Sequence, residues 1–120
     1  MSQQKQYSWH KIADTVMELP FAANGLFETE VEGKKICVSL HNETLHACAA
    51  KCPHASGALA SGHIDAMGNI VCPLHRYKFS LQTGRNVTGE GYYLKTYPVE
   101  TRADGIYIGL EKSGMFGWLK

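Results

Sequence analysis

Two short motifs in the middle of the chain combine cysteine and histidine at close spacing. The first is Cys52-Pro53-His54, the second is Cys72-Pro73-Leu74-His75, and residues 55 to 71 lie between them. A cysteine thiolate and a neutral imidazole are both metal ligands near neutral pH. Residues 52–62, CPHASGALASG, are too small and glycine-rich to fill a core, so a bound metal centre is the expected source of their order. We therefore predict that Cys52, His54, Cys72 and His75 bind metal.

The spacing within the first motif favours two metal ions over one. Only one residue separates Cys52 from His54, whereas ligand pairs on a tetrahedral zinc are typically separated by two to four residues. One thiolate and one imidazole from each motif would instead place two thiolates on one iron and two imidazoles on a second. That is the ligand division of a Rieske [2Fe–2S] centre. A zinc-stabilised interaction module without a redox role is the alternative that the residues leave open.

The two motifs resemble the ligand loops of Rieske-type ferredoxins. The resemblance extends to residues that follow each motif, namely Leu59, Gly62, Tyr77, Phe79 and Thr83-Gly84, and it is specific over about residues 48–85. It implies that Cys52 and Cys72 hold the inner iron of a [2Fe–2S] cluster. It also implies that His54 and His75 hold the outer iron through Nδ1, with their far ring edges near solvent.

The chain departs from the family pattern at several positions. High-potential members carry a disulfide between the two loops, but Gly57 and Leu74 stand at the matching positions here. In those members a serine and a tyrosine that follow the second histidine donate hydrogen bonds to the cluster sulfurs. Tyr77 aligns with the serine and Phe79 with the tyrosine, and Phe79 has no hydroxyl to donate. Fewer such hydrogen bonds favour a potential near the low end of the Rieske range of about −150 to +300 mV. Arg76 stands where many members have glycine after the second histidine.

The elements that must position these loops are predicted to be β-strands. Apolar and polar residues alternate over 27–31, over 36–41 with one buried face, and more weakly over 45–49. Further strands are predicted over 63–66, 70–72 and 77–81, followed by a loop over 86–93. The last two strands, over 96–101 and 106–110, are predicted to form a hairpin around the turn Ala103-Asp104-Gly105. The fold class is therefore all-β, a small antiparallel sandwich or barrel. The resemblance implies a single Rieske-like domain over 1–120, with a cluster-binding subdomain at about 48–85 inserted into a basal β subdomain at about 1–47 and 86–120.

Composition excludes several other classes of protein. The 120 residues are 44% hydrophobic and 19% charged, and the net charge is +1, so neither a disordered chain nor a nucleic-acid-binding protein is indicated. No apolar run is long enough for a membrane span, and the first ten residues lack a secretory signal, which favours the cytoplasm. Residues 46–88 carry four basic side chains (Lys51, Arg76, Lys78 and Arg85) against Asp65 alone, so a basic rim that steers an acidic partner is one reading and an ordinary solvated surface the other.

The remaining candidate residues are assigned structural roles. Cys37 and Cys48 are expected to be ordinary buried thiols, and His63 is expected to lie on a strand rather than on a metal. The apolar tail residues Phe116 and Trp118 are expected to pack against the β base, with a partner contact as the alternative.

The predicted function is one-electron transfer. The chain has no dinucleotide-binding glycine motif and no further set of two histidines and a carboxylate for a mononuclear iron. It is therefore predicted to be an electron carrier rather than an enzyme in itself. By the resemblance, a reductase would supply the electron and an oxygenase or other oxidoreductase would accept it. The alternative is a Rieske-like small subunit of a larger oxidoreductase, such as NADH-dependent nitrite reductase.

Overall fold

The computed structural model describes residues 6–54 and 56–112, and these form three antiparallel β-sheets. The first sheet has the order β1-β10-β9, the second β2-β3-β4-β8 and the third β5-β6-β7. The strands are β1 (Tyr7–Ala13), β2 (Leu26–Val31), β3 (Lys34–His41), β4 (Thr44–Ala49), β5 (His63–Ile64), β6 (Asn69–Val71), β7 (Lys78–Ser80), β8 (Thr96–Tyr97), β9 (Val99–Arg102) and β10 (Gly105–Glu111). Two 3₁₀ turns, η1 (Val16–Glu18) and η2 (Leu59–Ser61), complete the regular structure of the described residues. The predicted all-β antiparallel fold is confirmed.

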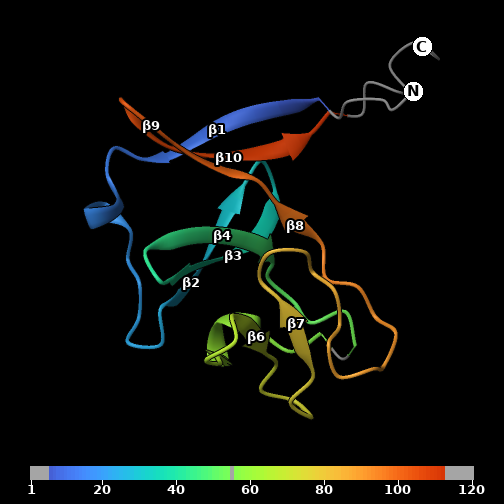
Figure 1. Cartoon of the computed structure of the whole chain (residues 1–120). Helices are drawn as coiled ribbons and strands as arrows, with labels where there is room; N and C mark the ends of the chain where they lie inside the picture. The colour runs from blue at the N-terminus through green and yellow to red at the C-terminus, as the bar shows by residue number, and fades with distance from the viewer. Residues whose placement is uncertain (1–5, 55, 113–120) are drawn as a thin grey trace, which may run out of the picture.

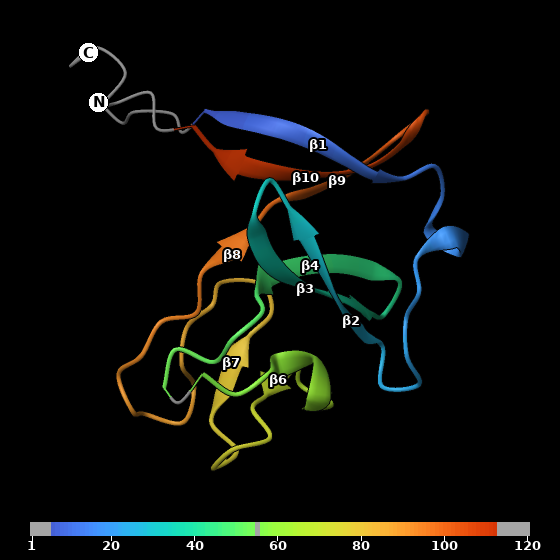
Figure 2. The same ribbon diagram turned by 180° about the vertical axis from the view of Figure 1, so that it is seen from behind.

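The sheets are stacked as layers, with β2-β3-β4-β8 in the middle (Figures 1 and 2). One face of the middle sheet packs on β1-β10-β9 through an aliphatic core that includes Ile36, Val38 and Ile108. The other face packs on β5-β6-β7 and the loops around it through a second core that includes Cys37 and Phe79. Candidate ligands Cys52 and Cys72 belong to this second core. The middle sheet is therefore the floor on which the candidate site is built.

Strand β3 corrects one sequence prediction. Its alternation predicts one buried face, but Ile36, Cys37, Val38 and Ser39 are all buried. Because side chains alternate between the two faces of a strand, Ile36 and Val38 enter the first core while Cys37 enters the second. From the sequence, the small side chains of Cys37 and Ser39 resemble a solvent-exposed face, but both are buried, and Cys37 packs in the second core.

The strand predicted over 96–101 is divided in two. Residues 96 and 97 pair with β4 in the middle sheet, whereas 99–102 pair with β10 in the first sheet. Pro98 lies at the change of sheet, and a proline has no N–H to continue a ladder. Its carbonyl still accepts a hydrogen bond from the Gly109 N–H at 2.9 Å. The chain therefore links the two layers at this point.

Strand β1 was not predicted from the sequence. It pairs antiparallel with β10, from Tyr7 opposite Glu111 to Ala13 opposite Ile106. Its residues are nearly all half-buried, so it lacks the contrast of apolar and polar faces on which the strand predictions depended. The hairpins over β2–β3, β3–β4, β5–β6 and β9–β10 agree with the sequence predictions.

Two glycines that belong to the family resemblance have steric reasons. A Cβ at Gly62 would lie 1.9 Å from the Val71 carbonyl oxygen, and a Cβ at Gly84 would lie 2.0 Å from the Leu94 carbonyl oxygen. Gly84 also has a φ of +80°, a conformation that residues other than glycine rarely adopt. These positions bring backbone segments together where no side chain fits.

The structure leaves some sequence predictions as they were. The division into subdomains at about residues 48 and 85 stays a prediction. The roles suggested for Phe116 and Trp118 fall outside the described residues. No helix in the described part of the chain is long and apolar enough to cross a membrane.

Candidate metal centre

The two motifs form loops that are closed in the same way. The Cys52 N–H donates a hydrogen bond to the Gly57 carbonyl at 2.8 Å, and the Cys72 N–H donates one to the Tyr77 carbonyl at 2.9 Å. Each cysteine therefore begins a loop that returns to it five residues later. The first loop is closed further by the bridge between Lys51 and Ala58, and the second joins β6 to β7.

The two cysteines lie together and away from water. Cys52 and Cys72 are 2% and 0% exposed, both are free thiols, and they are close enough to hydrogen-bond each other. Burial raises the pKa of the Cys72 thiol; the Leu74 N–H opposes this rise and Cys52 adds to it. A buried thiol pair of this kind is a sulfur donor set that a metal would convert to thiolates.

The two histidines form a second pair at the outer side of the loops. The His54 and His75 ring centroids are 5.0 Å apart, His54 is half-buried and His75 is exposed. The Nδ1 atom of His54 is buried and has no hydrogen-bond partner. A buried polar atom without a partner is costly, and a metal ion bound at this atom would satisfy it. The donors therefore fit a binuclear group that takes two sulfurs and two nitrogens.

No single point in the described part of the chain gathers three or more His, Cys, Asp or Glu donors around one ion. The donors are arranged as a sulfur pair and a nitrogen pair instead. This division is the one expected for two irons held by different ligand types.

A third segment, residues 86–92, adds aromatic contacts that the sequence analysis did not predict. The His54 ring lies 4.0 Å from the Tyr77 ring and 5.5 Å from the Tyr92 ring, centroid to centroid. Burial raises the pKa of Tyr77, and the Glu90 carboxylate and Tyr92 raise it further. Tyr92 stands in a glycine-containing stretch predicted only as a loop, and nothing in its spacing indicates that it lies on a histidine.

The loop that carries Tyr92 is organised by Asn86, which is 9% exposed. Its side-chain Nδ2 lies within hydrogen-bond distance of the Lys78 carbonyl, Thr88 Oγ1 and Glu90 Oε1, and its Oδ1 accepts from the N–H groups of Glu90 and Gly91. The Thr88 hydroxyl also donates to the Glu90 carboxylate. One buried side chain therefore fixes the course of the loop beside the two histidines.

The departures from the family pattern have clear positions. A Cβ at Gly57 would lie 3.1 Å from the Leu74 side chain and 3.3 Å from Cys72 Sγ, so Gly57 and Leu74 face each other across the loops. Phe79 is fully buried in the second core. His75 and Arg76 have φ values of +64° and +60°, so the turn after the second motif takes the left-handed conformation that glycine favours.

The other cysteines and the other nearby histidine lie apart from these pairs. Cys37 and Cys48 are buried cross-strand partners in β3 and β4, and the Cys37 hydrogen bond, followed by burial, raises the pKa of Cys48 well above its usual value. They are buried thiols, as expected. His63 is exposed on strand β5, also as expected.

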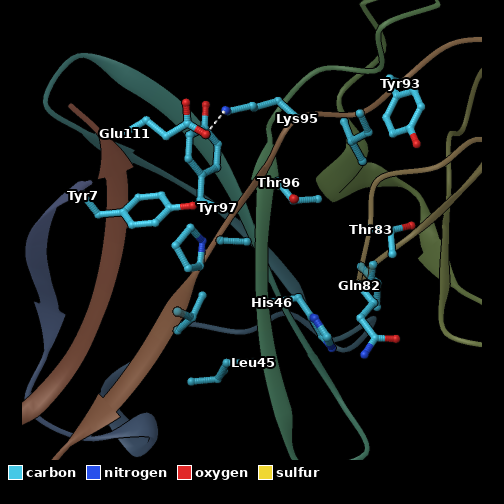
Figure 3. Close-up of a pocket in the computed structure, with 15 residues that line it drawn as sticks. Tyr7, Leu45, His46, Gln82, Thr83, Tyr93, Lys95, Thr96, Tyr97 and Glu111 are labelled. Carbon is cyan, nitrogen blue, oxygen red and sulfur yellow. Dashed lines mark hydrogen bonds and ion pairs between the residues drawn. The ribbon is translucent and has the colours of Figure 1, made fainter. Parts of the chain in front are cut away.

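A groove in the described structure is separate from the four candidate ligands. It has a volume of about 630 Å³ and lies beside β4, β8 and the end of β10 (Figure 3). The ion pair of Lys95 with Glu111, at 3.1 Å, lies at one side of it, and His46 is one of the residues that line it (Figure 3). Burial, followed by the nearby His41, lowers the pKa of His46.

Comparison with protein families gives a match to the Rieske [2Fe-2S] domain over residues 8–98. The chain is 27% identical to the alkene monooxygenase system, ferredoxin component, of Xanthobacter autotrophicus, over 68% of this chain and 67% of that protein. It is 30% identical to the naphthalene 1,2-dioxygenase system, ferredoxin component, of Pseudomonas aeruginosa, over 67% of this chain and 77% of that protein.

Solved structures share the fold. The ferredoxin of carbazole 1,9a-dioxygenase from Nocardioides aromaticivorans IC177 matches with a TM-score of 0.69 at 21% identity, covering 82% of this chain and 95% of that one. A protein from Mycobacterium tuberculosis described as an NADH-dependent nitrite reductase small subunit matches with a TM-score of 0.74 at 15% identity, covering 88% and 96%.

Proposed function

This chain belongs to the Rieske [2Fe-2S] domain family, and we propose that it acts as a one-electron carrier between a reductase and an oxygenase or other oxidoreductase. Its cofactor is the Rieske-type [2Fe–2S] cluster of that family. The two relatives named above are ferredoxin components of oxygenase systems, which are electron carriers and not the oxygenases themselves. When bound, such a cluster supplies reversible one-electron oxidation and reduction.

We propose that Cys52 and Cys72 hold one iron and that His54 and His75 hold the other. The observation that carries this assignment is the buried Nδ1 atom of His54, which has no protein partner and lies beside the ring of a second histidine. Both thiols are buried, so water is kept away from the side of the site that carries the sulfur ligands. Because His75 is exposed, a partner protein can come closest to the proposed cluster at this residue.

The missing hydroxyl at residue 79 supports a reduction potential at the low end of the Rieske range. Phe79 contributes a buried ring and no hydroxyl at the position where high-potential members have a hydrogen-bond donor. A reduced site carries one more negative charge, and fewer donors stabilise it less. A measured potential above about +100 mV would contradict this expectation.

A place as the small subunit of a larger oxidoreductase stays an open alternative. The fold match to the protein described as a nitrite reductase small subunit keeps this alternative in view. Gel filtration of the protein from its native source separates the two: a free carrier elutes near its own size, and a subunit co-elutes with a much larger chain.

We also propose that the protein works in the cytoplasm. Cys37 and Cys48, which the proposed cluster does not use, are free thiols although they are cross-strand partners, and unbridged neighbouring cysteines are typical of proteins in reducing compartments. Fractionation of cells into cytoplasm, membrane and exported protein tests this directly.

The ligand assignment is tested by spectroscopy of anaerobically purified protein. The wild type, reduced with dithionite, is expected to give the rhombic EPR signal of a Rieske centre, with two irons and two sulfides per chain. His75→Ala is expected to lose the signal and the iron, because it removes one of two nitrogen donors. His63→Ala, which alters an exposed strand histidine, is the matched control and should keep both. Full iron content in His75→Ala, or a colourless wild type that contains zinc, would reject the assignment.

A further inference from the structure

Arg76 occupies a backbone conformation that disfavours it. Its φ is +60°, and that of the preceding His75 is +64°, so two consecutive residues with side chains are left-handed. For residues other than glycine, this conformation brings Cβ against the following carbonyl oxygen. Glycine would take the same turn without that clash. An arginine here is unfavourable for the backbone, and an unfavourable backbone at an exposed site suggests a role for the side chain.

The Arg76 side chain makes no ion pair with any carboxylate in the described part of the chain, and it is exposed. Several other basic residues do have such partners. Lys78 pairs with Asp65 at 3.3 Å, and Arg102 pairs with Glu100 at 2.9 Å. The guanidinium of Arg76 therefore presents its charge and its planar set of donors to solvent.

The surroundings of Arg76 have the composition of a protein-binding surface. The exposed His75 precedes it, Leu74 is 45% exposed, and Tyr92, which lies against His54, is 39% exposed. Lys51, whose bridge to Ala58 closes the first loop, is also exposed, and no described carboxylate pairs with it. Apolar and aromatic side chains beside arginine are typical of contact surfaces between proteins.

The acidic residues of these loops are already engaged. Asp65 accepts hydrogen bonds from Met67 and Asn69 and pairs with Lys78, while Glu90 is held by Asn86 and Thr88. The charge of Asp65 is therefore balanced by Lys78, and the Glu90 carboxylate is held by neutral donors, whereas the Arg76 guanidinium has neither kind of partner among the described residues.

We propose that Arg76 is the anion-recognising residue of the docking face beside His75, and that the redox partner presents a carboxylate-rich surface to it. The proposal rests on the proposed electron-carrier function and adds the chemistry of the partner. The planar guanidinium can bind a carboxylate through two parallel hydrogen bonds. A positive rim of this kind accelerates the encounter with an acidic surface and fixes its orientation.

The test measures oxidation of the reduced holoprotein by ferricyanide in a stopped-flow instrument, with poly-L-glutamate as a carboxylate competitor. For the wild type we expect fast oxidation that slows as salt is added, because ferricyanide is an anion, and inhibition by poly-L-glutamate. Arg76→Glu should be oxidised about tenfold more slowly at low ionic strength and should resist the competitor. Its EPR signal should stay that of the wild type. Added negative charge beside the cluster can only lower the reduction potential, which would favour oxidation, so a slower oxidation reports a weaker encounter with the anion.

Two further variants separate charge from backbone shape and from overall charge. Arg76→Gly removes the charge and relieves the turn, so it should lose the inhibition by poly-L-glutamate while its melting temperature equals or exceeds that of the wild type. Lys34→Glu makes the same change in net charge as Arg76→Glu, at an exposed residue that begins β3, next to the turn between β2 and β3. That turn lies beside the first sheet and away from β6 and β7 (Figures 1 and 2). The oxidation of Lys34→Glu by ferricyanide should be as fast as that of the wild type.

The proposal is overturned if Arg76→Glu is oxidised at the wild-type rate at low salt, or if Lys34→Glu slows the reaction equally. Inhibition by a DNA oligonucleotide at lower charge concentration than by poly-L-glutamate would overturn it in favour of a phosphate ligand. Absence of the Rieske EPR signal would instead refute the proposed function, so the two failures are distinguishable.

Discussion

The contact between Gly57 and Leu74 predicts that a disulfide can be installed between the two loops. A Cβ at Gly57 would lie 3.1 Å from Leu74 Cγ. Because Cγ is one bond of about 1.5 Å from the Leu74 Cβ, the two Cβ atoms would lie at most about 4.6 Å apart. Disulfides have Cβ–Cβ distances of roughly 3.5–4.5 Å. The double variant Gly57→Cys/Leu74→Cys is therefore expected to cross-link with little movement of the backbone.

The size of the expected stabilisation follows from the loop that the bridge closes. Residues 57 to 74 make a loop of about 18 residues, and closing it in the unfolded chain is worth about 3 kcal/mol. For a domain of this size that corresponds to a rise in melting temperature of about 10 °C. The single variant Gly57→Cys should be less stable than the wild type, because the new side chain is crowded by the Leu74 side chain and by Cys72 Sγ.

The assay is thermal unfolding of the holoprotein, followed by circular dichroism, with and without the reductant TCEP. Alkylation and mass spectrometry of the unfolded protein count free thiols, which should number four in the oxidised double variant and six after reduction, given the four native cysteines. Leu74→Cys alone is the control for the loss of the leucine side chain. A folded double variant that stays uncrosslinked, or a stability gain that survives reduction, would refute this account of how the loops face each other.

Two further predictions concern the support of the site. Asn86→Ala should lower the free energy of unfolding by about 2–3 kcal/mol, because it removes several hydrogen bonds that one buried side chain makes to Lys78, Glu90 and Gly91; urea unfolding measures this, and a change under 1 kcal/mol would contradict it. Burial alone would raise the pKa of Asp65, but hydrogen bonds from Asn69 and Lys78 outweigh it and lower that pKa. A lowered carboxyl pKa adds stability that is present above the unfolded value, near 4, and is lost as pH falls through the folded value. The stability difference between wild type and Asp65→Asn should therefore be largest near pH 6 and shrink towards pH 2.5, and a constant difference would refute the role of the charge.

The candidate ligands were predictable because their chemistry is written in a few residue types at fixed spacing. Cys52, His54, Cys72 and His75 need no knowledge of the fold to be singled out, since thiols and imidazoles at such spacings have few other uses. The hairpins were predictable for a similar local reason. Alternation and turn residues act within ten residues of chain, and Glu32-Gly33 and Asn42-Glu43 take the positive φ values that tight hairpin turns require.

The parts that were not predicted depend on contacts between distant segments. Strand β1 forms against β10, nearly a hundred residues away, and its half-buried side chains carry little pattern of their own. The burial of both faces of β3 requires a third sheet, which the strand's own sequence does not reveal. The placement of Tyr92 on His54 likewise requires the loop to return to the first motif.

The return of that loop has an energetic consequence for the site. Residues 86–92 include Gly89 and Gly91, both with positive φ, and glycine loses more freedom on ordering than any other residue. The hydrogen bonds through Asn86 contribute about 1 kcal/mol each, which is no more than the cost of fixing each residue of the segment. The hydrogen bonds of Asn86 alone therefore do not order the loop, and the packing of Tyr92 on His54 and Tyr77 adds to them, as does the backbone hydrogen bond of the segment to Lys78. The aromatic contact thus orders the loop and holds the His54 ring at the same time, so the two cannot be loosened separately.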